Sequence, residues 1–407
     1  ADLGTILLDC PNTTTPLPYI DLVNELLEWH VAGKNQPFHY QTTRTPEELL
    51  VAPENVLDEV YDDILPKAVY PWTLPFSLAH ETARVFLGNF GLDRHRLMNL
   101  LAGALPTKEI EREAESLQIT LDELKLLRDI NAPPDPWTVW NLVESSNEIE
   151  DPLSDPDKPT ILTKQTWLQV LSFGKYLRQQ SGLSQEETLA ALMSRFVAYT
   201  GDLATKWPVT ECNFDRAVDL GLTAKQAQRF HQLVRLAAKL KWTLEATDVA
   251  LSAIGAPGID DDTLIVVARL ARLAARTGRP FVEMLTWVST IPTWPTTKDG
   301  PSLYEQTFLS PIANPDQQAP FLLNADRTAL AKEPAPFPGE LRPVAAAAAG
   351  LTLADFEALL ANEWIEDKLS LPTLARLHRI ATMARASGWS IVEWIRLLPL
   401  IAKPPIL

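Results

Sequence analysis

A short turn pattern that recurs along the chain constrains its fold more than any other feature. A glycine is followed by an apolar residue, then by Ser or Thr, and three positions later by a carboxyl or amide side chain. The pattern is typical of a helix that ends at a left-handed glycine and of a following helix that opens with a capping box. The clearest examples pair Ser184 with Glu187, Thr223 with Gln226, Thr352 with Asp355, and Ser390 with Glu393.

The spacing of these turns indicates helical hairpins. Leu183 and Leu222 are 39 positions apart, and Leu351 and Trp389 are 38 positions apart, which is the length of two short helices with their turns. A single amphipathic helix cannot bury its apolar stripe alone, so hairpins of this kind stack on their neighbours. Other spacings are irregular, and no run of alternating β-branched residues stands out. We therefore expect an all-α fold, an irregular array of helical hairpins that forms a shell-like bundle or solenoid.

Two proline-rich stretches divide the predicted array. One is the acidic run DPLSDPDKP, and the other contains ten prolines between Pro292 and Pro343. Proline removes a helix donor and clashes with the preceding turn, so both stretches are expected to be irregular. The predicted parts are an N-terminal helical region (1–150), a linker (151–160), hairpin repeats (161–291), a proline-rich loop or insertion (292–343) and C-terminal hairpins (344–407).

Composition and charge narrow the classes of partner. The formal net charge is −16, and an acidic chain gains nothing from phosphate attraction, so we expect no nucleic-acid partner. No apolar run approaches the roughly 20 residues of a membrane span, and no signal peptide is visible at the start of the chain. The two cysteines, Cys10 and Cys212, could form one disulfide, and their state stays open.

Motifs of catalysis and metal binding are not evident in the sequence. The six histidines show neither an HExxH arrangement nor zinc-finger spacing, so we expect ordinary surface or partly buried side chains. No phosphate-binding loop and no nucleophile elbow occur. Asp260 to Asp262 lack the alternating oxygens of a calcium loop and are interpreted as a helix N-cap with first-turn charge. We expect a non-catalytic chain with no cofactor and no metal.

Three arginines at helical spacing allow two interpretations. Arg269, Arg272 and Arg276 lie on one predicted helix face, where they could bind phosphate or lipid headgroups. The alternative, which we favour, is a solvated face or ion pairs with an acidic neighbouring hairpin. The twelve tryptophans allow a sugar-binding platform, but several stand at turn positions, which favours packing between hairpins.

Three motifs near the N-terminus point beyond a generic helical scaffold. They are NTTTPLPYIDLVNE ending at Glu25, TTRTPEEL beginning at Thr42, and AVYPWTLPF beginning at Ala68. In sequence and in order they resemble motifs of the A subunits of Tc toxin complexes and of the related virulence-plasmid A proteins. The prolines stiffen extended segments, and the aromatic residues are predicted packing anchors. The structural residues of these motifs are Pro16, Pro18, Tyr19, Asp21, Asn24, Glu25, Tyr70 and Trp72.

The resemblance implies a structural shell or scaffold segment of an insecticidal or virulence toxin. Family A subunits form homopentamers in which a helical shell encloses a translocation channel. They bind host surfaces, and a cocoon of B and C subunits delivers the toxic enzyme. This chain resembles part of the shell alone, so the cocoon would be contacted through regions outside it. The implied location is secreted or on the bacterial cell surface, and the implied partners are other segments and protomers of the A subunit, with the host surface as a further candidate.

Two other hypotheses stay open at this point. The chain could be a stand-alone helical-repeat adaptor or virulence protein that acts through protein–protein contacts. It could also be an enzyme whose site is dispersed along the chain, which a deep pocket with converging acids or histidines would favour. The host, the receptor and any glycan preference are not encoded in a readable motif.

Overall fold

A computed structural model gives the structure of the chain. It describes residues 19–33, 44–103, 107–128, 135–151, 162–198, 214–216, 220–256, 258–297, 300–310 and 318–401.

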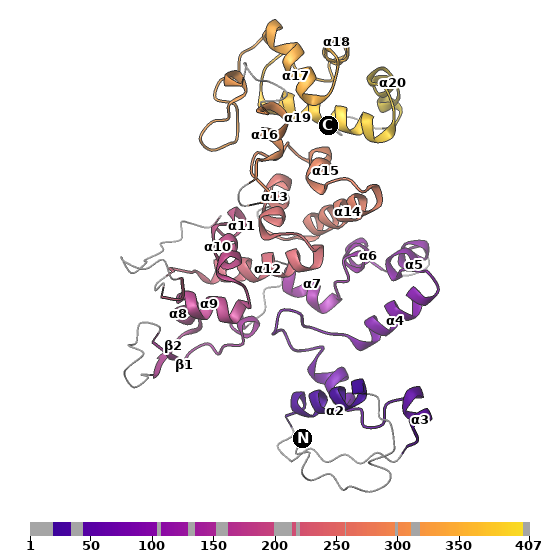
Figure 1. Cartoon of the computed structure of the whole chain (residues 1–407), viewed down its shortest axis with the longest axis vertical. Coiled ribbons are helices and arrows are strands. Elements are labelled where there is room, and N and C mark those ends of the chain that lie inside the picture. Colours follow the sequence, from indigo (N-terminus) through magenta and orange to yellow (C-terminus); the bar gives the residue numbers. More distant parts are fainter. Residues whose placement is uncertain are drawn as a thin grey trace.

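Helices dominate the described residues, and the predicted all-α class is confirmed. Figure 1 shows them following one another along an elongated molecule, from α2 and α3 at one end to α17, α18 and α20 at the other. Consecutive helices pack against each other along most of this path, as expected when each helix buries its apolar face on a neighbour.

The N-terminal part contains short helices with long connections. Its helix α6 packs against α14, which lies far away in sequence, and this contact joins the N-terminal part to the middle of the array. The elements are α2 (Tyr19–Val31), α3 (Pro46–Val51), the π-helical turn η2 (Val60–Ile64), α4 (Leu78–Asn89), α5 (Arg94–Leu100), α6 (Glu109–Ser116), α7 (Leu121–Leu127) and the 3-10 turn η4 (Thr138–Trp140).

A small antiparallel sheet follows, which the sequence analysis did not predict. Strand β1 (Asn147–Glu150) pairs with β2 (Leu162–Gln165), so that Asn147 lies opposite Gln165. The strands flank the predicted linker 151–160, of which Asp151 alone lies within the described residues. Four-residue strands made mostly of polar side chains carry no readable alternation of apolar residues.

The middle of the chain contains two helices of 17 residues, α12 and α14, and the largest core. Phe230, Leu233 and Leu236 of α12 are fully buried in a cluster that also takes in α7, α10 and η4. The elements are α8 (Trp167–Leu171), α9 (Gly174–Ser181), α10 (Gln185–Met193), α11 (Arg195–Ala198), η5 (Phe214–Arg216), α12 (Ala224–Leu240), α13 (Leu244–Ile254), α14 (Asp261–Thr277) and α15 (Phe281–Val288).

The C-terminal part forms a second core, to which the proline-rich segment contributes. The described residues of this segment are largely irregular, as expected, but they do not form a loop outside the core. Tyr304, Phe308, Phe321 and Phe337 are buried in the same cluster as the following helices. The elements are α16 (Leu303–Phe308), η6 (Ala319–Phe321), η7 (Gly339–Leu341), α17 (Arg342–Ala349), α18 (Leu353–Ala361), α19 (Leu371–Ser387) and α20 (Ile391–Ile401).

The recurring turns form capping boxes in the structure. At the start of α10 the Glu187 amide donates to the Ser184 hydroxyl at 3.2 Å, and the Ser184 amide donates to the Glu187 carboxylate at 2.9 Å. Gly182 ends the preceding helix with a φ of 69°, a left-handed conformation that favours glycine. The same reciprocal bonds join Thr223 with Gln226, Thr352 with Asp355, and Ser390 with Glu393.

Buried apolar side chains are distributed unevenly along the chain. Among the described residues between 19 and 103, Leu49 and Val60 are the only ones in the buried apolar core. The same stretch exposes many large apolar side chains, among them Val85 and Phe86 of α4 and Phe90 directly after it. No single helix among the described residues is long and apolar enough to cross a membrane; the pair 339–349 and 353–361 meets that test jointly but bends by 108°.

Candidate functional site

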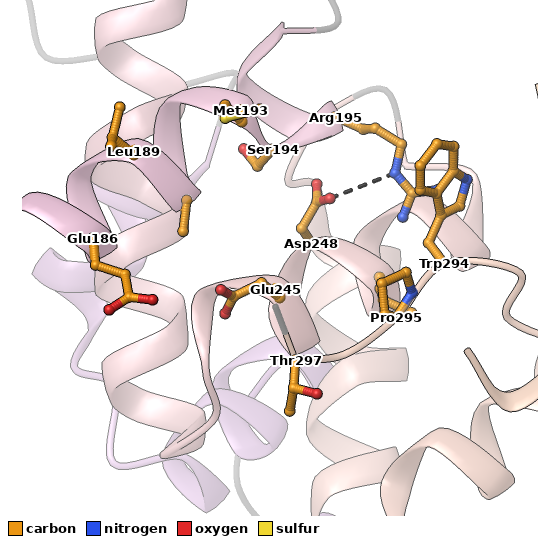
Figure 2. A pocket seen from close by; sticks show the side chains of 12 residues that line it. Glu186, Leu189, Met193, Ser194, Arg195, Glu245, Asp248, Trp294, Pro295 and Thr297 are labelled. Atoms are coloured by element: carbon orange, nitrogen blue, oxygen red, sulfur yellow. Dashed lines mark hydrogen bonds and ion pairs between the residues drawn. The ribbon is translucent and has the colours of Figure 1, made fainter. Parts of the chain in front are cut away.

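A cavity of about 490 Å³ lies between α10 and α13 and is closed on one side by the segment that follows α15 (Figure 2). Its walls are mainly apolar. Leu189 and Ala190 come from α10, Val249 comes from α13, and Trp294 with Pro295 comes from the closing segment. The capping box at Ser184 sets where α10 begins, and Thr243 caps the start of α13, so local sequence signals position both walls.

One ion pair lies at the junction of these walls. The Asp248 carboxylate accepts from the Phe196 amide at 2.8 Å and lies 3.5 Å from the Arg195 Nε. Burial lowers the pKa of Arg195, and the charge of Asp248 opposes that shift. The pair, together with the bond from the Phe196 amide, therefore ties the start of α11 to α13.

Trp294 is held at the cavity by two arginines. The guanidinium carbon of Arg195 lies 4.8 Å from the indole centroid, and that of Arg327 lies 5.1 Å from it. Arg327 also donates to the Thr293 carbonyl at 2.8 Å and pairs with Glu305 at 3.1 Å. Both cation–π contacts stabilise the indole in its position at the cavity.

The remaining charges of the cavity are acidic. Glu186 of α10 and Glu245 in the first turn of α13 line it together with Asp248, so three carboxylates face one guanidinium. The Ser194 hydroxyl on the wall donates to the Ala191 carbonyl at 2.7 Å, within its own turn. The arrangement is suited to holding a ligand and shows no activated nucleophile among the described wall residues.

The residues of the first resemblance motif differ in burial and in contacts. Pro16 and Pro18 lie outside the described residues, as do Cys10 and Cys212. Tyr19 and Asn24 are exposed on α2, and Asp21 is half-buried. Glu25 is buried and accepts from the Asn55 side chain at 3.0 Å. Burial raises the pKa of Glu25, and the Asn55 bond opposes this.

The neighbouring Glu28, which the sequence analysis did not single out, binds the same segment. Its carboxylate accepts from the Leu57 amide at 2.8 Å and from the Tyr61 hydroxyl at 2.7 Å. Burial, and then the bond to Glu28, raise the pKa of Tyr61 to about 12. The two carboxylates therefore attach α2 to the chain around η2. The spacing of Glu25 and Glu28, which places both on one helix face, was the sequence signal that could have predicted this shared contact.

The third resemblance motif forms a buried joint with α12. Trp72 packs edge-on against Trp140 with ring centroids 4.9 Å apart, and its indole N–H donates to the Val139 carbonyl at 2.6 Å. The buried Arg235 of α12 donates to the carbonyls of Trp72, at 2.9 Å, and of Leu74, at 2.5 Å, and also to the Val69 carbonyl. Tyr70 between them is half-buried. We call these interactions of residues 69–75 with Arg235 and Trp140 the α12 joint.

Two histidines differ from the expected surface or partly buried positions. His231, one turn before Arg235, is 1% exposed, and His378 of α19 is 6% exposed. Burial, and then the nearby charge of Arg235, lower the pKa of His231 to about 3. Burial and Arg385 lower the pKa of His378 to about 4. Both rings are therefore neutral core side chains at ordinary pH. A single sequence could not show this because it depends on which helices cover them.

Two arginines on the predicted face of α14, Arg269 and Arg272, form ion pairs with a neighbouring helix, as in the favoured interpretation. Arg272 pairs with Glu113 of α6 at 2.6 Å, and Arg269 contacts Glu113 at 3.4 Å and also pairs with Glu109. The hydrogen bonds and charges of these arginines outweigh burial and lower the pKa of Glu113. The pairs account for the contact between α6 and α14.

The predicted acidic N-cap is also present. The Asp260 carboxylate accepts from the Thr263 amide at 2.8 Å, and hydrogen bonding to the Thr263 side chain and then to its amide lowers the pKa of Asp260. Across the residues that the structure describes, no three His, Cys, Asp or Glu side chains are grouped to hold a metal ion.

Comparison with known proteins gave no match, whether with family models, curated sequences or solved structures. The resemblance to Tc toxin A subunits therefore stays a prediction that rests on the motifs themselves.

Sequence reasoning missed the cavity and the α12 joint. Arg195, Asp248 and Trp294 are up to 99 positions apart, and Arg235 is more than 160 positions from its carbonyl partners. No local pattern marks such pairs. The one available signal was an arginine between apolar residues on the buried stripe of α12, where a charge requires a partner.

Proposed function

We propose that this chain is a non-catalytic scaffold segment in the helical shell of a Tc-type toxin A subunit. The proposal rests on the three ordered motifs and on the hairpin array. The observation that carries it is the α12 joint, in which a resemblance motif serves as a packing anchor: Trp72 contacts Trp140, and Arg235 binds the motif carbonyls. Because these motif residues pack and bind the backbone, they favour a structural role for the chain over a catalytic one.

A scaffold also needs fixed angles between its hairpins, and polar side chains supply them at a second junction. Arg379 of α19 donates to the Thr286 carbonyl at 2.5 Å and to the Ser289 carbonyl. The Trp287 indole donates to the Thr382 hydroxyl at 2.9 Å. Directional bonds across a packed interface restrict sliding, so α15 and α19 are held in one orientation.

The proposed partners follow from that role. They are other segments of the A subunit and its neighbouring protomers in a homopentamer, with host surfaces as a further contact. The B–C cocoon would be reached through other regions of the subunit. The proposed location is accordingly secreted or on the bacterial cell surface.

The test uses the natural gene product. Its full reading frame would be expressed, purified and imaged by negative-stain electron microscopy, with vesicle permeabilisation as a functional readout. The proposal predicts a reading frame that continues well past Leu407, five-fold particles and permeabilised vesicles. A natural product that ends near Leu407 and stays monomeric contradicts it.

That second outcome would support a stand-alone helical adaptor. An exposed apolar surface at the end of α4 favours this alternative. Val85 and Phe86 of α4 and the following Phe90 are each more than 60% exposed, and the two phenylalanine rings lie 5.4 Å apart. Contiguous exposed apolar side chains mark interaction surfaces. Capture of one defined partner by the monomer, lost in a Phe86→Ser, Phe90→Ser variant, distinguishes the adaptor.

A further inference from the structure

Exposed apolar side chains are concentrated in the N-terminal part of the chain. More than half of the large apolar side chains that are exposed among the described residues lie between Tyr19 and Leu101. The same part contributes only Leu49 and Val60 to the buried apolar core. Apolar surface of this density is typical of a face that a protein partner covers.

Helix α2 is oriented with its acidic side toward the rest of the molecule. Its buried residues are Glu25 and Glu28, which bind the chain around η2. A different side carries Ile20, Leu27 and Val31, and the spacing of seven and four positions places these three on one helix face. They are 43% to 62% exposed. An amphipathic helix normally buries its apolar stripe, so this α2 face lacks the cover that it requires.

Helix α4 shows the same inverted arrangement. Its Arg84 is directed inward, where the guanidinium donates to the Glu115 carboxylate of α6 at 2.8 and 3.0 Å. None of the residues of α4 is buried. Val85, Phe86 and the following Phe90 are exposed, and we call these three the α4 surface.

We propose that the α2 face of one copy of the chain packs on the α4 surface of a second copy. The inference deepens the proposed function and rests on it, because the partner that it names is a neighbouring protomer. A contact between two different faces is head-to-tail, and its repetition closes into a ring or extends as a filament. Helices of 13 and 12 residues bring stripes of similar length to this contact.

Charge argues against a contact between two α2 faces. The described residues 19–33 and 44–67 contain ten acidic side chains and two basic ones, Arg44 and Lys67. Two copies joined through their α2 faces would bring these acidic regions together, and like charges that meet at an interface oppose binding.

The region around the α4 surface has no such excess of acid. Residues 77–103 contain three arginines and two acids, and Glu115 compensates two of the arginines, Arg84 and Arg94. The third, Arg96, is exposed and forms no ion pair with the residues that the structure describes. It is therefore available to the acidic region of a second copy, so the charges permit and favour the contact of α2 with α4.

A second copy covers both faces at once, which neither of the other arrangements does. A contact of the α4 surface with itself would leave the α2 face exposed. A foreign partner that binds the α4 surface, as in the adaptor alternative, would leave it exposed as well. The experiment therefore has to separate these three arrangements.

The first measurement is self-association of the purified chain, followed by sedimentation velocity over a dilution series. Leu27→Ser and Phe86→Ser should each weaken it at least about tenfold, the effect of one buried apolar side chain. The control is Leu162→Ser, which removes an exposed leucine from β2. All three positions are exposed, so the variants should keep the helix content of the wild type by circular dichroism.

Charge is tested in the same assay. Arg96→Glu should weaken self-association at least about threefold, the usual effect of one exposed charge pair. The control is Arg276→Glu, which makes the same change at an exposed arginine of α14 and should have no effect.

Disulfide trapping identifies which faces meet. Leu27→Cys and Phe86→Cys are made separately in a chain with Cys10→Ser and Cys212→Ser, and each variant carries a different tag. After mild oxidation the mixture should contain a dimer of the two different variants. Each variant alone should stay uncrosslinked.

Three results would overturn the inference. They are a chain that stays monomeric at every concentration, equal effects of Leu27→Ser, Phe86→Ser and Leu162→Ser, and crosslinking of Phe86→Cys with itself instead of with Leu27→Cys. Five-fold particles of the natural gene product together with any of these results would retain the scaffold role and remove this interface. A trapped contact of α2 with α4 in a product that forms open filaments would retain the interface and contradict the homopentamer.

Discussion

Replacing Arg235 with methionine should open the α12 joint while leaving most of the molecule folded. Arg235 is 1% exposed and supplies donors to three carbonyls of the 69–75 segment. Methionine matches much of its length and apolar stem but donates nothing. The substitution therefore leaves the carbonyls of Val69, Trp72 and Leu74, in a half-buried segment, without this partner.

The magnitude follows from two opposed effects. Because the segment is half-buried, each unpaired acceptor costs about 1 kcal/mol, the low end of the range for buried groups, or about 3 kcal/mol for the three. Removing a buried charge works the other way, because burial disfavours the guanidinium and lowers the pKa of Arg235 to about 10 despite the charge of Glu123. The net loss should be about 2 kcal/mol, confined to the joint, which corresponds to a roughly 30-fold easier opening.

Hydrogen exchange measured by mass spectrometry reads this opening directly, because local unfolding exposes the amides of the segment. Peptides that cover 69–75 and 137–142 should lose about 30-fold in protection, while those of α19 should keep theirs. Arg96→Met, at an exposed arginine of α5, is the control and should change neither set. Arg235→Lys should fall between, since a point-like ammonium cannot span three carbonyls. Unchanged protection of 69–75 in Arg235→Met would refute the reasoning.

Three further predictions concern stability. In the folded chain His231 carries no proton above its pKa of about 3, whereas in the unfolded chain it binds one below about pH 6.5. The free energy of unfolding should therefore decrease as the pH is lowered from about 6.5 to 3, by up to about 1.4 kcal/mol per pH unit. In the His231→Phe variant the urea midpoint of unfolding should depend less on pH in this range than in the wild type. The same pH dependence in both proteins would argue against this reasoning. Gly174→Ala should destabilise the α9–η5 contact by at least about 2 kcal/mol, because a Cβ there would lie 2.2 Å from the Phe214 carbonyl oxygen; a melting temperature equal to wild type would contradict this. Ser184→Ala should cost about 1 kcal/mol through loss of the α10 cap, measured by urea unfolding against Ser145→Ala at an exposed serine outside the helices, and equal losses would exclude a capping effect.

Local sequence signals predicted the helices well because their causes are local. The box of Ser184 and Glu187 involves two residues three positions apart, and the left-handed Gly182 precedes them directly. The same holds for the Asp260 cap. Such features form wherever the pattern occurs, whatever packs on top of them.

The candidate site could not be predicted in this way because its causes are tertiary. Trp294 belongs to a segment predicted as loop, and only the approach of Arg195 and Arg327 makes it a cavity wall. Similarly, Phe337 lies within a run of prolines that indicates irregular chain, yet irregular chain can still fill a core. The period of apolar residues predicts regular structure and carries no information on burial of irregular segments.

The uneven distribution of the core has a consequence for tolerance to substitution. Between residues 19 and 103, Leu49 and Val60 are the only described members of the buried apolar core, whereas α12 alone buries Phe230, Leu233 and Leu236 completely. Polar replacements on α4 should therefore leave the isolated chain folded and instead improve its solubility. The same replacements on α12 should abolish accumulation of soluble protein. A variant library could be scored once for the abundance of soluble protein and once for assembly. Polar substitutions on α4 should lower the assembly score alone, whereas those on α12 should lower both scores.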